Sequence, residues 1–206
     1  MNTLKKLLHP EGVSGKYIKY MRWSFASNIL ASTQQTLVVH NMLLGVNSAE
    51  TDNMKTVNYV GKDVIGQMGS LIYMANMAEK ADKDPRKFLR YSNIFQQLSY
   101  AITCASSMTH PMFFLPQAGI ANTMINISFT GFGTINAKCI KEISNDNMGE
   151  IYAKLTVINT LGSSLGMIMG VILLSFVPEP ENRIFLVMLF GIGRIYTFNK
   201  AVEEII

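Results

Sequence analysis

Three long segments without a charged side chain constrain the fold of this chain more than any other feature. No Asp, Glu, Lys or Arg occurs in residues 23–49, 91–137 or 155–178. The charges gather in short islands between these segments, such as EKADKDPRKFLR at residues 79–90. Because charged side chains are rarely buried without a partner, this alternation indicates long elements of low charge joined by solvated loops.

The uncharged segments have the spacing of helices rather than of strands. Their β-branched residues recur at helical intervals and do not alternate. Pro85 fits the first turn of a new helix, and Pro111 and Pro116 interrupt the chain before the next one. We therefore predict an all-α, multi-helix bundle in a single domain, residues 1–206, with its core over residues 10–202. The six predicted helices cover residues 16–44, 54–81, 85–108, 113–143, 148–177 and 181–205.

Residues 155–177 are the best candidate for a membrane span. They are uncharged and long enough to cross ~30 Å of hydrocarbon as a helix. Gly162, Gly166 and Gly170 stand four residues apart, so they share one helix face and would let a neighbouring backbone approach. The alternative is the central helix of a soluble bundle, where glycines cost stability. We predict a bundle embedded in membrane lipid, with an orientation left open because Lys and Arg lie on both sides of the span.

Composition and motif spacing argue against nucleic-acid binding, metal binding and catalysis. The net charge is +4, but the basic residues are scattered and not interleaved with aromatic ones, so we expect no nucleic-acid partner. Cys104 and Cys139 lack a CxxC partner and a nearby histidine, which predicts two buried thiols and no metal site. No cleaved signal peptide is expected before Pro10. The three histidines have no acidic or cysteine neighbour at catalytic spacing, so we predict a protein that is not an enzyme and holds no cofactor.

The stretch YVGKDVIGQMGSLIYM, residues 59–74, places a lysine and an aspartate inside a helix. At helical spacing Lys62, Gly66 and Gly69 share a polar, glycine-lined face, and Asp63 lies at its edge. Lys62 and Asp63 are adjacent, so we expect each to find its partner on another element or in water rather than in the other. Three interpretations stay open: a solvated helix face, a structural network between helices, and a ligand site facing a polar cavity.

The order of several motifs resembles one protein family. The motifs PEG, VSGKYIKYMRW, LLGV, GKDVIGQMG, FLPQAGIANT, GTINA, DNMGEIYAK and IYTFNKAV follow the order seen in the root UVB sensitive (RUS) family, a eukaryotic group associated with vitamin B6 homeostasis. The resemblance covers residues 10–202. The matching positions are Pro10, Gly12, Tyr17, Tyr20, Trp23, Gly45, Lys62, Asp63, Gly66, Gly69, Asn122, Thr134, Asn147, Met148, Ala153, Lys154, Thr160, Ala201 and Val202.

The chain also departs from the family pattern at polar positions. Ser24 and Ser70 stand where the family usually has an acidic residue and an arginine, and Lys141 stands where a histidine is usual. Val157 and Ile158 replace a Ser-Gln pair. These departures predict a divergent, compact member of the family.

The resemblance implies a membrane protein for which no catalytic mechanism is established. We predict two alternative functions. In the first, the bundle binds or transports a small polar metabolite, related to vitamin B6 by the family association. In the second, it is a membrane-associated adaptor that acts through protein–protein contacts, for instance with a partner of the same family, and has no small ligand. The residues predicted for the ligand site or polar network are Lys62, Asp63, Asn122, Thr134, Asn147 and Lys154, and those predicted for helix packing are Gly66, Gly69, Gly162, Gly166 and Gly170.

Overall fold

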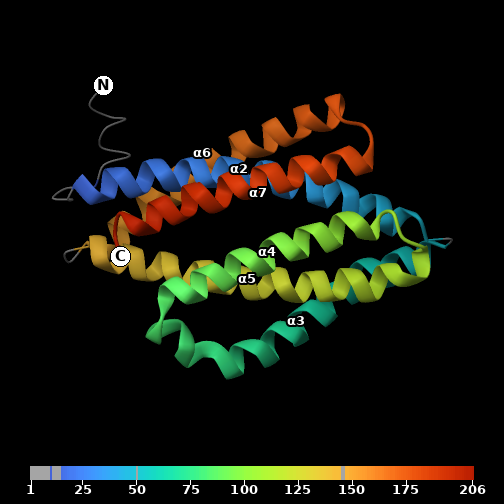
Figure 1. Ribbon diagram of the computed structural model, residues 1–206, viewed down its shortest axis with the longest axis horizontal. Helices are drawn as coiled ribbons and strands as arrows, with labels where there is room; N and C mark the ends of the chain where they lie inside the picture. Colours follow the sequence, from blue (N-terminus) through green and yellow to red (C-terminus); the bar gives the residue numbers. More distant parts are fainter. Residues whose placement is uncertain (1–9, 11–14, 50, 145–146) are drawn as a thin grey trace.

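The predicted all-α bundle is confirmed (Figure 1). The computed structural model describes residue 10 and residues 15–49, 51–144 and 147–206, of which residues 76–82 by their backbone alone. These residues contain helices and no strand, and the ends of the helices differ from the prediction by at most three residues. The helices are α2 (Gly15–Asn47), α3 (Asp52–Lys83), α4 (Pro85–Ser106), α5 (Phe114–Ile143), α6 (Met148–Phe176) and α7 (Pro180–Glu203), and a short 3₁₀ helix, η1, covers Pro111–Phe113.

Local chemistry accounts for several helix ends. The Asp84 side chain accepts a hydrogen bond from the backbone N–H of Lys87 at 3.0 Å and so caps α4, whose first residue is Pro85. Pro180 is likewise the first residue of α7, although the Glu179 side chain before it makes no capping hydrogen bond. Pro111 begins η1, which turns the chain before α5. Proline suits these positions because the first helical residues need no N–H donor.

The helices form two layers (Figure 1). In one layer α2 packs along α6 and α7, and in the other α5 packs along α3 and α4. The layers meet chiefly where α4 contacts α2 and α7. α5 and α6 are consecutive in the chain but make few contacts with each other. The two layers are therefore not tightly packed against each other between these helices.

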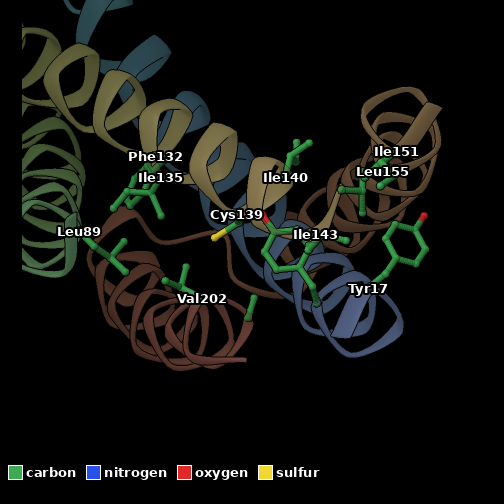
Figure 2. Close-up of a cluster of buried hydrophobic side chains, with 12 residues drawn as sticks. Tyr17, Leu89, Phe132, Ile135, Cys139, Ile140, Ile143, Ile151, Leu155 and Val202 are labelled. Atoms are coloured by element: carbon green, nitrogen blue, oxygen red, sulfur yellow. The ribbon is translucent and has the colours of Figure 1, made fainter. Parts of the chain in front are cut away.

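The largest apolar cluster lies at the end of the bundle where α2 and α6 begin and α5 and α7 end (Figure 2). Tyr17, Cys139 and Ile151 are fully buried there. Cys104 is buried in a second cluster, formed with residues of α2, α4 and α7, and both cysteines are free thiols as predicted. The apolar end cluster consists of Tyr17, Tyr20, Leu89, Phe132, Ile135, Cys139, Ile140, Ile143, Ile151, Leu155, Ala201 and Val202.

Outside this cluster, many exposed side chains are apolar and many buried ones are polar. On the outer face of α3, Met68, Leu71 and Ile72 are 61%, 70% and 68% exposed. The most apolar window of α6 is only 22% buried, and α6 and α7 are both long and apolar enough to cross a membrane. Many buried side chains are polar instead: Ser24, Ser27, Thr33, Gln34, Asn41, Asn58, Lys62, Ser92, Asn93, Gln96, Ser99, Thr103, Ser106, Ser128, Arg183, Arg194 and Thr197.

The polar face of α3 points into the protein. Lys62 is only 7% exposed and Gly66 is buried, because this face packs against α5. The interpretation of this face as solvated is therefore wrong for Lys62. Only its edge reaches the surface, where the Asp63 side chain is 43% exposed.

The glycine face of α6 lies against α2. A Cβ atom added at Gly162 would stand 3.0 Å from the carbonyl oxygen of Phe25, and one at Gly170 would stand 2.6 Å from Cβ of Thr36. At Gly166 it would collide with the carbonyl oxygen of Ile29. Small residues at this spacing let two backbones approach closely, which is how helices associate where no water drives them together.

Candidate functional site

Lys62, Asp63 and Asn122 meet at the seam between α3 and α5. The Lys62 ammonium donates to Oδ1 of Asp63 at 2.6 Å. Nδ2 of Asn122 donates to the same oxygen at 2.9 Å and to the Lys62 carbonyl oxygen at 3.2 Å. The prediction that the two charged neighbours do not pair is wrong, because the flexible lysine side chain bends toward the adjacent residue. Asp63 does, however, also take a partner from another helix.

Two glycines make this seam possible. A Cβ atom added at Gly66 would stand 2.6 Å from Nδ2 of Asn122, and one at Gly69 would stand 2.5 Å from Cγ2 of Thr123. A larger side chain at either glycine would collide with the Asn122 or Thr123 side chain of α5. The glycines therefore bring the Asn122 amide within hydrogen-bond distance of the charged pair.

Lys62 also borders a pocket between the two layers. Its ammonium lies 4.7 Å from the centre of the Tyr59 ring, a favourable cation–π distance. The pocket beside it, which we call the Lys62 pocket, has a volume of about 290 Å³. It is lined by Gln35, Val38, Val39, Met42, Tyr59, Lys62, Ser99, Tyr100, Thr103, Ala118, Asn122, Ile125, Asn126 and Phe129, from α2, α3, α4 and α5.

A second pocket, the Arg194 pocket, adjoins the first and has a volume of about 280 Å³. The two share Gln35, Tyr100 and Phe129 as walls. Its lining is rich in hydroxyl and amide groups from both layers. These residues are Ser24, Ser27, Asn28, Ala31, Ser32, Gln35, Gln96, Tyr100, Phe129, Phe132, Gly133, Asn136, Asn159, Ser163, Arg194 and Phe198.

A third pocket, the α5–α6 pocket, continues the series and has a volume of about 350 Å³. It shares Asn136, Asn159 and Ser163 with the Arg194 pocket. It lies where α5 and α6 touch little, and Thr160, one of the positions that resemble the RUS family, lines it. Neighbouring pockets share lining residues, and we call the three together the polar track after the hydroxyl and amide groups in their walls.

Hydrogen bonds between helices fix the positions of several side chains that line this track. Oδ1 of Asn159 on α6 accepts bonds from Ser24 Oγ and from Asn28 Nδ2 of α2, each at 3.0 Å. The Tyr20 hydroxyl donates to Oδ1 of Asn136 on α5. Such cross-helix bonds fix the positions of the lining side chains without closing the space between them.

Three predicted site residues lie away from this track. The Thr134 hydroxyl donates to the Thr130 carbonyl oxygen of its own helix at 3.0 Å. Asn147 precedes α6, and Lys154 forms an ion pair with Glu150 one turn earlier at 2.7 Å. None of the three lines a pocket of the track.

Arg194 is the main lining residue that the sequence prediction missed. It is 5% exposed, and its Nη1 donates to Oε1 of Gln96. The sequence carried a signal, because Arg194 is the one charged residue within residues 184–199, the middle of α7. A lone ionisable residue in such a segment is a candidate functional residue. No group of three or more His, Cys, Asp or Glu side chains that could hold a metal ion occurs among the described residues.

Comparisons with known proteins agree with the motif order. The chain is 25% identical to protein root UVB sensitive 4 of Arabidopsis thaliana over 84% of its own length and 34% of the relative's length. It is 23% identical to RUS family member 1 of Dictyostelium discoideum, over 88% of the chain and 36% of that protein. It is 21% identical to protein root UVB sensitive 2, chloroplastic, of Arabidopsis thaliana, over 92% of the chain and 44% of that protein.

The chain thus spans less than half the length of these relatives. No solved structure matches it. The family described as the vitamin B6 photo-protection and homoeostasis domain matches residues 4–206. This chain therefore belongs to the vitamin B6 photo-protection and homoeostasis domain family, whose members include the root UVB sensitive proteins.

Proposed function

We propose that this chain is a membrane-embedded helical domain that binds a small polar molecule between its two layers and lets it pass along the polar track. One observation carries the proposal: three adjoining pockets, whose walls include many hydroxyl and amide groups, lie inside a bundle whose helices α3, α6 and α7 expose large apolar side chains. In water, these polar side chains would be expected outside. In a membrane, polar side chains that face the bundle interior mark ligand pathways.

The family description makes a vitamin B6 compound the first ligand to test. Such a compound is a pyridine ring that carries hydroxyl groups. The Phe129 and Phe132 side chains in the Arg194 pocket offer apolar ring faces, and Ser27, Asn28 and Ser163 offer hydrogen-bonding groups. The proposal assigns binding and passage to the domain and no chemical reaction.

The test measures binding of pyridoxine to the protein purified in detergent, by calorimetric titration. We expect saturable binding to the wild type. In the double variant Lys62→Met/Asp63→Asn we expect affinity to fall roughly tenfold, because the ligand loses hydrogen bonds to charged groups. We expect little change in the melting temperature, because the amide oxygen introduced at position 63 still accepts the hydrogen bond from Asn122. The matched control is Lys55→Met/Asp52→Asn, which removes an exposed 3.0 Å pair from the same helix. Absence of saturable pyridoxine binding to the wild type would contradict the proposal for this ligand.

One observation favours the adaptor function as a second candidate. Lys62 already has a counter-ion in Asp63, and Asn122 ties both residues to α5, so this cluster can serve as a junction between helices. On this reading the same double variant unfolds at a lower temperature, because a buried network is broken. The wild type then binds no pyridoxine. The two functions thus predict opposite results for one pair of measurements.

A further inference from the structure

We infer that Arg194 forms a binding site for the phosphate group of a small molecule held in the Arg194 pocket. The inference rests on the proposed function, namely that the track holds a small molecule. It adds the charge class of that molecule and the residue that recognises it.

Arg194 is buried without a counter-ion. It is 5% exposed, and among the described residues no carboxylate lies within 4.0 Å of its guanidinium. Burial of a charge costs several kcal/mol unless the charge is paired and its hydrogen bonds are satisfied. Arg194 also lies near the middle of α7, a helix apolar enough to cross a membrane. An uncompensated arginine there needs a functional reason.

The protein satisfies this guanidinium only in part. Nη1 donates to Oε1 of Gln96 and, at 3.5 Å, to Oδ1 of Asn93, both neutral acceptors. The guanidinium carbon lies 4.1 Å from the centre of the Phe132 ring. Nε is buried and has no hydrogen-bond partner among the described residues. The paired N–H donors of a guanidinium can bind two oxygens of a phosphate or carboxylate at once.

The surroundings of Arg194 also favour an anion. The residues that line the three pockets include no Asp or Glu, and their only charged members are Lys62 and Arg194. Lys62 is neutralised by Asp63, whereas Arg194 is not. The Ser27 and Ser163 hydroxyls line the same pocket and donate no hydrogen bond to another described residue, so they are available to a ligand.

The other buried arginine of α7 shows the contrast. Arg183 donates to the carbonyl oxygen of Val177 at 2.8 Å, to that of Pro178, and to Oδ1 of Asn41 at 3.1 Å. These bonds close the turn between α6 and α7 onto α2, and Arg183 lines none of the three pockets. Its position is explained by structure alone, whereas that of Arg194 is not.

The experiment compares pyridoxine with pyridoxine 5′-phosphate, which differ only in the phosphate and cannot form a Schiff base with lysine. Both are titrated into the purified full chain at constant ionic strength, and thermal unfolding is followed with and without inorganic phosphate. We expect the phosphate ester to bind the wild type about 10- to 100-fold more tightly than pyridoxine, as charge-assisted hydrogen bonds predict. Arg194→Gln should remove that preference, and Arg194→Lys should retain part of it. Lys200→Gln, which removes an exposed charge from the same helix, should leave it unchanged.

The outcomes separate this inference from the proposed function. If pyridoxine and its phosphate bind the wild type equally well, or if Arg194→Gln keeps the preference, the anion site is wrong while the binding function stands. A third outcome is that neither pyridoxine nor its phosphate binds, but inorganic phosphate raises the melting temperature of the wild type and not of Arg194→Gln. In that case the anion site stands, and the assignment of a vitamin B6 compound as the ligand is wrong. If no phosphate compound affects the wild type, the inference is overturned, whether or not the variants fold.

Discussion

At the scale of single residues, Asn122 joins α3 to α5. Its amide group donates to Asp63 and to the Lys62 carbonyl oxygen, and Gly66 leaves the space in which it lies. The Asp63 carboxylate therefore has two donors, one from its own helix and one from the neighbouring helix α5. An amide that bonds to a charged acceptor is worth more than one that bonds to a neutral group.

Asn122→Ala should lower the free energy of unfolding by ~1–2 kcal/mol, because Asp63 loses its donor from α5. Chemical denaturation in detergent, followed by circular dichroism, measures the change. Asn126→Ala is the control: Asn126 lies about one turn further along α5, and its side chain makes no hydrogen bond to a described residue. An equal loss of unfolding free energy in both variants would mean that the Asn122–Asp63 hydrogen bond does not stabilise the contact between α3 and α5.

At the scale of elements, α2 and α6 are held together by close backbone approach. Gly162, Gly166 and Gly170 all face α2, and the Thr33 hydroxyl donates to the Gly166 carbonyl oxygen at 3.0 Å. The glycines that weaken an isolated helix thus permit contacts that wider side chains would prevent.

Gly166→Ala should destabilise the protein by ~1–3 kcal/mol, because the added methyl group meets the Ile29 carbonyl oxygen and lies 2.9 Å from Cβ of Ser32. Gly149→Ala, in the first turn of the same helix, should be neutral or stabilise by up to ~1 kcal/mol, because no atom lies within 4 Å of the added carbon. The melting temperatures of the two variants, compared with that of the wild type, measure these effects. Equal tolerance of both substitutions would mean that the helices are further apart than described.

At the scale of the whole molecule, large apolar side chains lie on the surface as well as in the core, and many polar side chains are buried. α3, α6 and α7 expose large apolar side chains, while the interior holds serines, asparagines, glutamines and two arginines. Large exposed apolar patches mark interaction surfaces, and α6 and α7 are long and apolar enough to cross a membrane. Lipid is the solvent that fits such a surface, and this fits the proposed membrane location.

Ile168→Lys tests that location. Ile168 is 57% exposed on α6, and a lysine there would cost ~2.5–3.5 kcal/mol on insertion scales if lipid surrounds it. We expect the wild type to stay in the membrane pellet after alkaline carbonate extraction and the variant to be lost from it. Ala153→Lys, at an exposed position near the start of the helix, should behave as the wild type. Release of the wild type by carbonate would contradict the membrane location.

The sequence alone determined the helices and their order. Charge-free segments, helical spacing and prolines at helix starts are local properties, so they could be read without knowledge of the fold. The four-residue spacing of Gly162, Gly166 and Gly170 showed that they share a face, and the motif order identified the family. Of the predicted polar site, the structure brings together Lys62, Asp63 and Asn122 and leaves Thr134, Asn147 and Lys154 elsewhere.

Only the tertiary structure decided which faces point inward. The polar face of α3 is buried because α5 presents Asn122 and Thr123 to it, and that depends on how two separate helices pack. The sequence shows Arg194 as the lone charge within residues 184–199. The absence of a described carboxylate beside it follows from the tertiary structure, which places Gln96 of α4 and Phe132 of α5 against it. Side-chain partners across a bundle are long-range contacts, and no local pattern in one chain specifies them.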